Sequence, residues 1–148
     1  MVSVRVEHIL RSKGTQVVTV SPDATITDAA GLLGSHGVGA LVVSGDGRHI
    51  DGIISERDIA RALADHGARL GDMRVADLMS TQVHTCRKDD RVESLMQLMT
   101  QRRIRHVPVV DDAGELSGIV SIGDVVKLRL DELEEEARTL HDYIETGR

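Results

Sequence analysis

The chain has 148 residues, enough for one domain or for two small halves that share a core. Its 41% apolar and 28% charged residues are typical of a soluble globular protein, but Tyr143 is the only aromatic residue, which excludes an aromatic platform for single-stranded nucleic acid. A net charge of −6 argues against general binding to nucleic acid or to anionic membranes.

In chain order, the pattern first predicts a short helical lead-in at residues 5–10 and then a β-α-β-β-α unit. The helix of this unit has apolar residues spaced i, i+3, i+4 and i+7. A Ser-Gly-Asp-Gly turn separates its second and third strands. We expect a strand at 17–20, a helix at about 25–36, a strand at 40–43 and a third strand that ends at Ser55.

The same order recurs in the second half of the chain. We expect a lead-in at 74–79, a strand at 83–86, a helix at about 91–102, a strand at 107–110 and a third strand ending at Ser121. The segment 64–73 between the halves contains two glycines and is predicted to be a loop. The predicted domains are a first repeat (1–66), a linker (67–73), a second repeat (74–130) and a C-terminal helical extension (131–148).

One eight-residue stretch occurs in both halves. Residues 52–59 are Gly-Ile-Ile-Ser-Glu-Arg-Asp-Ile, and residues 118–125, which lie 66 positions later, are Gly-Ile-Val-Ser-Ile-Gly-Asp-Val. A Gly followed by two β-branched residues favours a short buried strand. Ser-x-x-Asp then matches a helix N-cap with an acidic residue in the first turn.

The Ser-x-x-Asp pairs have two interpretations that can hold together. In the first, Ser55 and Ser121 cap helices, and Asp58 and Asp124 only stabilise those helices. In the second, the hydroxyl and the carboxylate at a strand-to-helix turn hold a polar ligand. A carboxylate can accept two hydrogen bonds from a cis-diol such as ribose, and a helix N-terminus suits an anion.

The last predicted helix continues beyond the second repeat with apolar residues at alternating spacings of four and three. They are Val126, Leu130, Leu133, Ala137, Leu140 and Ile144. This is an a/d heptad seam of fewer than three heptads. We interpret it as a helix that pairs in a homodimer, and the alternative is a helix packed along its own domain.

These residues resemble the tandem CBS domain, the cystathionine-β-synthase domain pair or Bateman module. The resemblance is carried by the repeated Gly-Ile-(Ile/Val)-Ser-x-x-Asp-(Ile/Val) stretch, by 75–80 (Val-Ala-Asp-Leu-Met-Ser) and by 105–111 (Arg-His-Val-Pro-Val-Val-Asp). It covers about residues 5–130. It implies a mixed α/β (α+β) fold of two β-α-β-β-α repeats packed as a pseudo-twofold pair, here with an extended C-terminal helix.

The resemblance also implies two clefts that bind an adenosine ligand: AMP, ADP, ATP, NAD(H) or S-adenosylmethionine. Carried over by position, Asp would bind the ribose hydroxyls and Ser the ribose or phosphate. The first cleft would contain Ser55, Asp58, Val83, His84, Ile104, Arg105 and His106. The second would contain Ser121, Asp124, Val17, Val18, Val38, Gly39 and Ala40.

The two clefts are predicted to be unequal because a basic cluster occurs in only one copy. Arg102, Arg103, Arg105 and His106 have the counterparts His36, Gly37, Gly39 and Ala40. Arg105 or His106 is expected to contact an anion, as these positions do in some relatives. Arg102 and Arg103 are also interpreted simply as the end of a helix, where they offset the negative end of its dipole.

The leading functional hypothesis is a regulatory module that senses an adenosine nucleotide and signals to an unidentified regulated protein by a conformational change. The alternative is a constitutive dimeric interaction protein without nucleotide binding. We expect no enzyme and no catalytic cofactor, because no nucleophile–base pair is visible. No metal site is expected either, because the seven histidines lack ligand spacing.

The expected location is the cytoplasm. The single Cys86 cannot form an internal disulfide, which fits a reducing compartment. The first residues lack the apolar core of a signal peptide, and no apolar run approaches the 18 residues of a membrane span.

Overall fold

The structure is a computed structural model that describes residues 4–146. Its elements follow the predicted order in the first half, and in the second half they do so except for the first strand. The first half contains α1 (Val6–Lys13), β1 (Thr19–Val20), α2 (Ile26–His36), β2 (Ala40–Val43), β3 (Gly52–Ser55), α3 (Glu56–His66) and the 3₁₀ helix η1 (Gly67–Asp72). The second contains α4 (Val75–Leu78), α5 (Val92–Arg102), β4 (His106–Val110), β5 (Leu116–Ser121) and α6 (Ile122–Glu145). The predicted mixed α/β fold of two repeats with a long last helix is confirmed.

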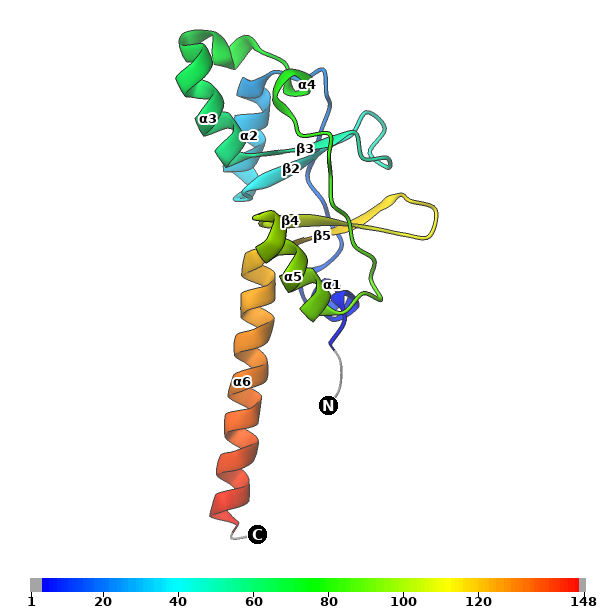
Figure 1. Cartoon of the computed structure of the whole chain (residues 1–148), viewed down its shortest axis with the longest axis vertical. Helices are drawn as coiled ribbons and strands as arrows, with labels where there is room; N and C mark the ends of the chain where they lie inside the picture. Colours follow the sequence, from blue (N-terminus) through cyan, green and yellow to red (C-terminus); the bar gives the residue numbers. More distant parts are fainter. Residues whose placement is uncertain (1–3, 147–148) are drawn as a thin grey trace.

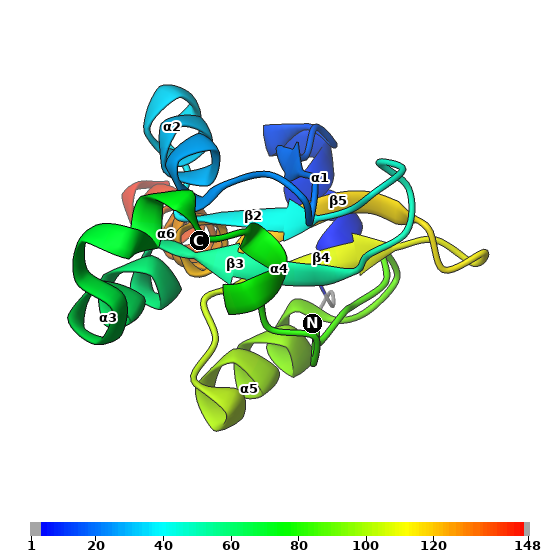
Figure 2. The ribbon, with the colours of Figure 1, turned by 90° about the horizontal axis from the view of Figure 1, so that it is seen from above.

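Two small sheets face each other at the centre of the molecule. In the first repeat β1 pairs parallel to β2, and β2 pairs antiparallel to β3. In the second repeat β4 and β5 form an antiparallel pair. Figures 1 and 2 show β2–β3 stacked over β4–β5, with the helices arranged around them. The pseudo-twofold arrangement therefore brings strand ends from both repeats together.

The strand expected at 83–86 is wrong in its extent, because it is reduced to a single bridge between Cys86 and Val109. The backbone of Ser80 hydrogen-bonds to Ile53 in the first repeat, whereas Cys86 hydrogen-bonds to Pro108 and Val110 in the second. Residues 81–85 must therefore span the distance between the sheets and cannot run along either one. The first-half strand is likewise shorter than predicted and starts at Thr19.

The loop expected at 64–73 is also wrong. Helix α3 continues to His66, and residues 67–72 form η1. The side chain of Leu70 is buried in the first repeat's core, and the Thr27 hydroxyl donates a hydrogen bond of 2.9 Å to the carbonyl of Gly71. These two anchors hold the segment against α2 despite its glycines.

The lead-in helices are exchanged between the repeats. Val6, Ile9 and Leu10 of α1 pack in the core of the second repeat, with residues such as Val107 and Val120. Val75 of α4 packs in the core of the first repeat. Each core is therefore completed by a helix that precedes the other repeat in the chain, and this interlocks the two halves.

The last helix leaves the body of the molecule (Figure 1). Its 24 residues extend about 36 Å at 1.5 Å per residue, and Val125 in the first turn is 2% exposed. The seam residues beyond it are solvent-exposed, from 44% at Leu133 to 67% at Ile144. The alternative of a helix packed along its own domain is therefore wrong for this chain.

The glycine that opens each repeated stretch lies at a close crossing. A Cβ atom at Gly52 would lie 2.8 Å from the sulfur of Met79 and 2.8 Å from the carbonyl oxygen of Ser80. A Cβ atom at Gly118 would lie 2.9 Å from Cδ2 of Leu10. The segment after each lead-in helix, or the helix itself, thus packs directly on the strand backbone.

The two glycines give a matched pair of variants. We expect Gly52→Ala to lower the free energy of unfolding by about 2 kcal/mol, because its methyl group meets backbone that cannot rotate away. Gly118→Ala meets only the end of a flexible leucine side chain, so its cost should be below about 1 kcal/mol. Urea denaturation of both variants measures the difference. Equal stability of the two would contradict the crossing as the reason for glycine.

Candidate functional site

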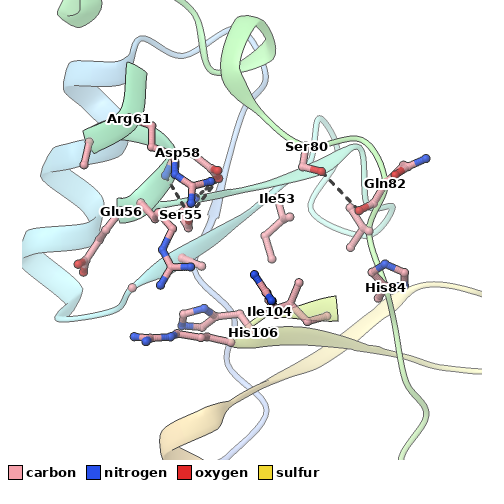
Figure 3. Close-up of a pocket in the computed structure, with 17 residues that line it drawn as sticks. Ile53, Ser55, Glu56, Asp58, Arg61, Ser80, Gln82, His84, Ile104 and His106 are labelled. Atoms are coloured by element: carbon pink, nitrogen blue, oxygen red, sulfur yellow. Dashed lines mark hydrogen bonds between the residues drawn. The ribbon is translucent and has the colours of Figure 1, made fainter. Parts of the chain in front are cut away.

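A cavity of about 660 Å³ lies between the two repeats, and we call it the inter-repeat cavity. The end of β3 and the start of α3 border it on one side, the start of β4 borders it on the other, and residues 80–84 close its flank (Figure 3). Its volume lies in the range of sites for small molecules. Both repeats contribute side chains, so a molecule bound here would touch both.

All seven residues predicted for the first cleft line this one cavity: Ser55, Asp58, Val83, His84, Ile104, Arg105 and His106. Gly39 and Ala40, which were predicted for the second cleft, line it too. The other five residues of that second set do not line it: Val17, Val18, Val38, Ser121 and Asp124. The structure thus assembles one predicted cleft completely.

Eight residues of the lining were not assigned to either predicted cleft: Ile53, Glu56, Arg57, Ala60, Arg61, Ser80, Gln82 and Arg103. Part of the signal was available, because Arg103 belongs to the predicted basic cluster, and Arg57 and Arg61 are one helical turn apart in the helix that begins after Ser55. The contribution of Ser80 and Gln82 could not be predicted, because it depends on the segment that crosses between the sheets.

Ser55 and Asp58 form a capping box at the cavity. The Ser55 hydroxyl accepts a hydrogen bond from the Asp58 N–H at 3.2 Å, and Asp58 Oδ2 accepts from the Ser55 N–H at 2.8 Å and from its hydroxyl at 3.0 Å. No other hydrogen bond to this carboxylate forms within residues 4–146, so Oδ1 has no partner there. The cap interpretation is confirmed for Ser55, and the same carboxylate faces the cavity (Figure 3).

The second Ser-x-x-Asp pair forms the same box, but its carboxylate has an additional partner. Asp124 Oδ2 accepts a hydrogen bond of 2.8 Å from the Ser121 N–H and one of 2.7 Å from Lys13 Nζ. Lys13 also donates to the carbonyl of Ile119 at 2.9 Å. Partial burial would raise the pKa of Asp124, but the bonds from Lys13 and Ser121 outweigh it and hold that pKa below its ordinary value.

His106 of the second repeat packs closely against Gly39 of the first. A Cβ atom at Gly39 would be 3.1 Å from Cε1 of this imidazole, so a larger residue there would require the ring to shift by a few tenths of an ångström. Burial lowers the pKa of His106, and the positive charge of Lys13 lowers it further, whereas Asp124 and Glu56 act in the opposite direction. The ring is therefore neutral at pH 7 and can accept or donate a hydrogen bond.

The cavity is more basic than the chain as a whole. Four arginines line it, Arg57, Arg61, Arg103 and Arg105, against the two carboxylates of Glu56 and Asp58. The chain itself carries a net charge of −6. This local reversal of sign favours a ligand with at least one negative charge.

The remaining candidates for chemistry contribute little. Burial, and then the negative charge of Asp90, raises the pKa of Cys86 to about 12, so its thiol stays protonated. Residues 4–146 contain no group of three His, Cys, Asp or Glu side chains placed to hold a metal ion. None of the helices in the described part of the chain has both the length and the apolar character for a membrane crossing.

Comparison with known proteins gives a consistent family. The family model described as the CBS domain matches twice, at residues 6–65 and 75–131. The mitochondrial CBS domain-containing protein CBSX3 of Arabidopsis thaliana is 37% identical over 98% of this chain and 74% of its own length. The crystal structure of the CBS-domain protein ATU1752 of Agrobacterium tumefaciens is 45% identical, with a TM-score of 0.81 over 85% of this chain and 99% of that one.

Two similar solved structures are described with ligands. The CBS domain pair of protein MJ0100, in complex with 5′-methylthioadenosine and S-adenosyl-L-methionine, is 29% identical with a TM-score of 0.78 over 88% of this chain and 99% of that one. The CBS domain protein PAE2072 of Pyrobaculum aerophilum, complexed with AMP, is 32% identical with a TM-score of 0.71 over 82% and 89%. The shared ligand chemistry of these two proteins is adenosine.

The depressed pKa of His106 predicts an acid-sensitive step in stability. Below pH 6.5 the unfolded chain binds a proton that the folded chain resists, so the stability present above pH 6.5 is lost as the pH falls. We expect the melting temperature of the wild type to fall more between pH 7.5 and 5.5 than that of His106→Gln. The exposed His36 supplies the control His36→Gln, which should follow the wild type. If the melting temperature of His106→Gln fell as much as that of the wild type, the prediction would be wrong.

Proposed function

This chain belongs to the CBS-domain family, and from that premise we propose that it is a regulatory module that binds an adenosine ligand in the inter-repeat cavity. The observation that carries the proposal is the position of Asp58. Its Oδ2 is engaged by the Ser55 cap, its Oδ1 accepts no hydrogen bond within residues 4–146, and the residue lines the cavity. A carboxylate held in this way can accept hydrogen bonds from both hydroxyls of a ribose.

The surroundings of Asp58 fit the rest of such a ligand. Ile53, Val83 and Ile104 offer apolar surface in a chain without Phe or Trp, so the adenine would lie between aliphatic side chains and strand backbone. Arg105 and His106 offer hydrogen-bond donors for an anionic group. The AMP bound by PAE2072 and the S-adenosylmethionine bound by MJ0100 support this class of ligand.

Signalling follows from the position of the cavity between the repeats. A ligand here touches β3 and α3 of one repeat and the start of β4 of the other. It therefore binds with different affinity to different relative positions of the repeats, and binding shifts their population. The proposed output is a change in contact with a regulated protein.

The second predicted cleft differs in the charge at its carboxylate. Asp124 Oδ2 accepts a charge-assisted hydrogen bond of 2.7 Å from Lys13 in addition to its cap, whereas Asp58 has only its own cap. The proposal therefore assigns ligand binding to the Ser55–Asp58 side, and Ser121 and Asp124 act as a helix cap that is held by Lys13.

Thermal unfolding with AMP, ADP, ATP, NAD, NADH and S-adenosylmethionine tests this function. A ligand at 100 times its Kd stabilises by about 2.7 kcal/mol, which corresponds to a rise of roughly 5–10 °C in melting temperature. We expect this rise in the wild type and in Asp124→Asn, and its loss in Asp58→Asn, which preserves a cap acceptor. No shift with any of the six at millimolar concentration would contradict the proposal and leave the constitutive interaction protein as the better explanation.

We also propose that the regulatory module is a homodimer joined by α6 in a parallel coiled coil. The exposed seam of Val126, Leu130, Leu133, Leu140 and Ile144 supplies the a and d positions. Its flanking charges select a second copy in one orientation. In a parallel pair Arg129 faces Glu134 of the other copy, which brings opposite charges together. Glu136 faces His141 of the other copy, so no like charges meet in either contact.

An antiparallel pair on the same seam is disfavoured by charge. It gathers Glu134 and Glu136 of both helices at the centre of the interface, where their like charges repel. The parallel arrangement also places the two bodies at the same end of the dimer, because α6 leaves each body at its first turn (Figure 1).

Cysteine cross-linking distinguishes these arrangements. In a parallel pair Ile144→Cys should form an intermolecular disulfide, whereas in an antiparallel pair two such residues lie about 27 Å apart. Glu135→Cys, on the opposite face of α6, is the matched control and should not cross-link; the native Cys86 is buried. A monomer by light scattering, or equal cross-linking at both positions, would contradict the proposal.

A further inference from the structure

A basic recess of about 310 Å³ adjoins the inter-repeat cavity. Arg57, Arg103 and Arg105 line it together with Met99, Thr100, Ile104 and Ile122. Three arginines and Ile104 belong to the walls of both spaces. A ligand can therefore extend from the cavity into the recess past the side chain of Arg57.

The arginines of the recess carry charge that the protein does not neutralise. No carboxylate lines the recess, and within residues 4–146 the side chains of Arg57, Arg103 and Arg105 form no ion pair and no hydrogen bond. The three guanidinium groups around the recess repel one another. An anion between them offsets that repulsion and can accept several charge-assisted hydrogen bonds.

The arginines of the recess occur in only one copy of the repeat. Each of its three arginines aligns with a glycine of the other repeat: Arg57 with Gly123, Arg103 with Gly37 and Arg105 with Gly39. A charged side chain is thus present at every one of these positions in one repeat and at none in the other. The elements that carry or adjoin these positions occur in both repeats, as α2 and α5, β2 and β4, and α3 and α6, so these elements form with glycine as well as with arginine.

Arg103 shows that the arginine is held at a conformational cost. It is the only non-glycine residue with a positive φ in the described part of the chain, at 55°, and it ends α5 in the left-handed region. Gly37 ends α2 in the same way, with a φ of 62°. Glycine is the residue that this backbone favours, so the arginine is present for its side chain.

We propose that the basic recess binds the polyphosphate of the adenosine ligand, so that the protein selects ATP and ADP over AMP, adenosine and S-adenosylmethionine. This inference rests on the proposed function, because it assigns the nucleoside to the inter-repeat cavity. The recess has the volume of about ten water molecules, more than one phosphate group fills. The sulfonium and ammonium groups of S-adenosylmethionine would meet three like charges there.

Isothermal titration with ATP, ADP, AMP, adenosine and inorganic tripolyphosphate, all without divalent cations, tests the recess. We expect affinity to fall in the order ATP, ADP, AMP, adenosine. Arg103→Gly restores the glycine of the other repeat and relieves the backbone, so it should fold. This variant should weaken the binding of ATP by about tenfold, which corresponds to the loss of one charge-assisted hydrogen bond. The affinity for adenosine should not change.

Arg105→Gln should behave as Arg103→Gly does. Arg102→Gln is the matched control, because it removes the same charge from a neighbouring residue that lines neither space. It should bind ATP as the wild type does. Equal affinity for ATP and adenosine, or an equal loss of ATP affinity in the control, would overturn the recess as a phosphate site while the proposed function stands.

Tripolyphosphate separates the two proposals in the other direction. Suppose that tripolyphosphate binds the wild type but not Arg103→Gly, and that no adenosine compound binds. The recess is then an anion site, and the proposed nucleoside function fails. If neither tripolyphosphate nor any adenosine compound binds, both proposals are overturned.

Discussion

The strand-to-helix corner that the chain carries twice is the constraint on which the rest of the structure depends. Its glycine admits the segment that crosses the strand, the second of its β-branched residues (Ile54 or Val120) enters the core, and its Ser and Asp close a capping box on the helix that follows. The corner therefore fixes strand, helix and crossing segment at once. At Asp58 the box uses one carboxylate oxygen of a residue that lines the cavity, so the contact that stabilises the helix also fixes the position of a candidate binding group.

The same corner has different surroundings in the two repeats, and this difference determines where the chemistry lies. Lys13 at the end of α1 reaches Asp124, because α1 packs on the second repeat and not on the first. The exchange of lead-in helices thus places a cation at one box and leaves the other facing an open cavity. The arginines that align with glycines add charge to the open side only. A symmetric fold consequently carries one basic site.

The sequence predicted most of the fold because its periodicities are local. The strand at 40–43, the helix ending at residue 102 and the caps at Ser55 and Ser121 depend on neighbours within a few positions. The exchanged lead-in helices and the crossing segment at 81–85 depend on contacts between the halves, which periodicity does not encode. The loop expected at 64–73 failed for the same reason, since Leu70 is ordered by the core it enters.

The candidate site shows the same division. The resemblance placed seven residues in one cleft, and the structure brings all seven to one cavity. It could not predict that Lys13 would engage Asp124, because Lys13 lies in the segment where the two halves differ in length. Arg57 and Arg103 are sequence neighbours of predicted site residues, but only the fold shows that they line one recess together with Arg105.

The recess also connects the site to the helix that we assign to dimerisation. Ile122, the first residue of α6, lines the recess, and its N–H donates a hydrogen bond of 2.8 Å to the carbonyl of Arg105. The backbone that carries a ligand-binding arginine is thus bonded directly to the start of a helix about 36 Å long. A rigid helix converts a small rotation at its first turn into a larger displacement at its far end. Because the seam lies along that far part, a ligand that repositions Arg105 would act on the orientation of two subunits without any contact to the seam itself.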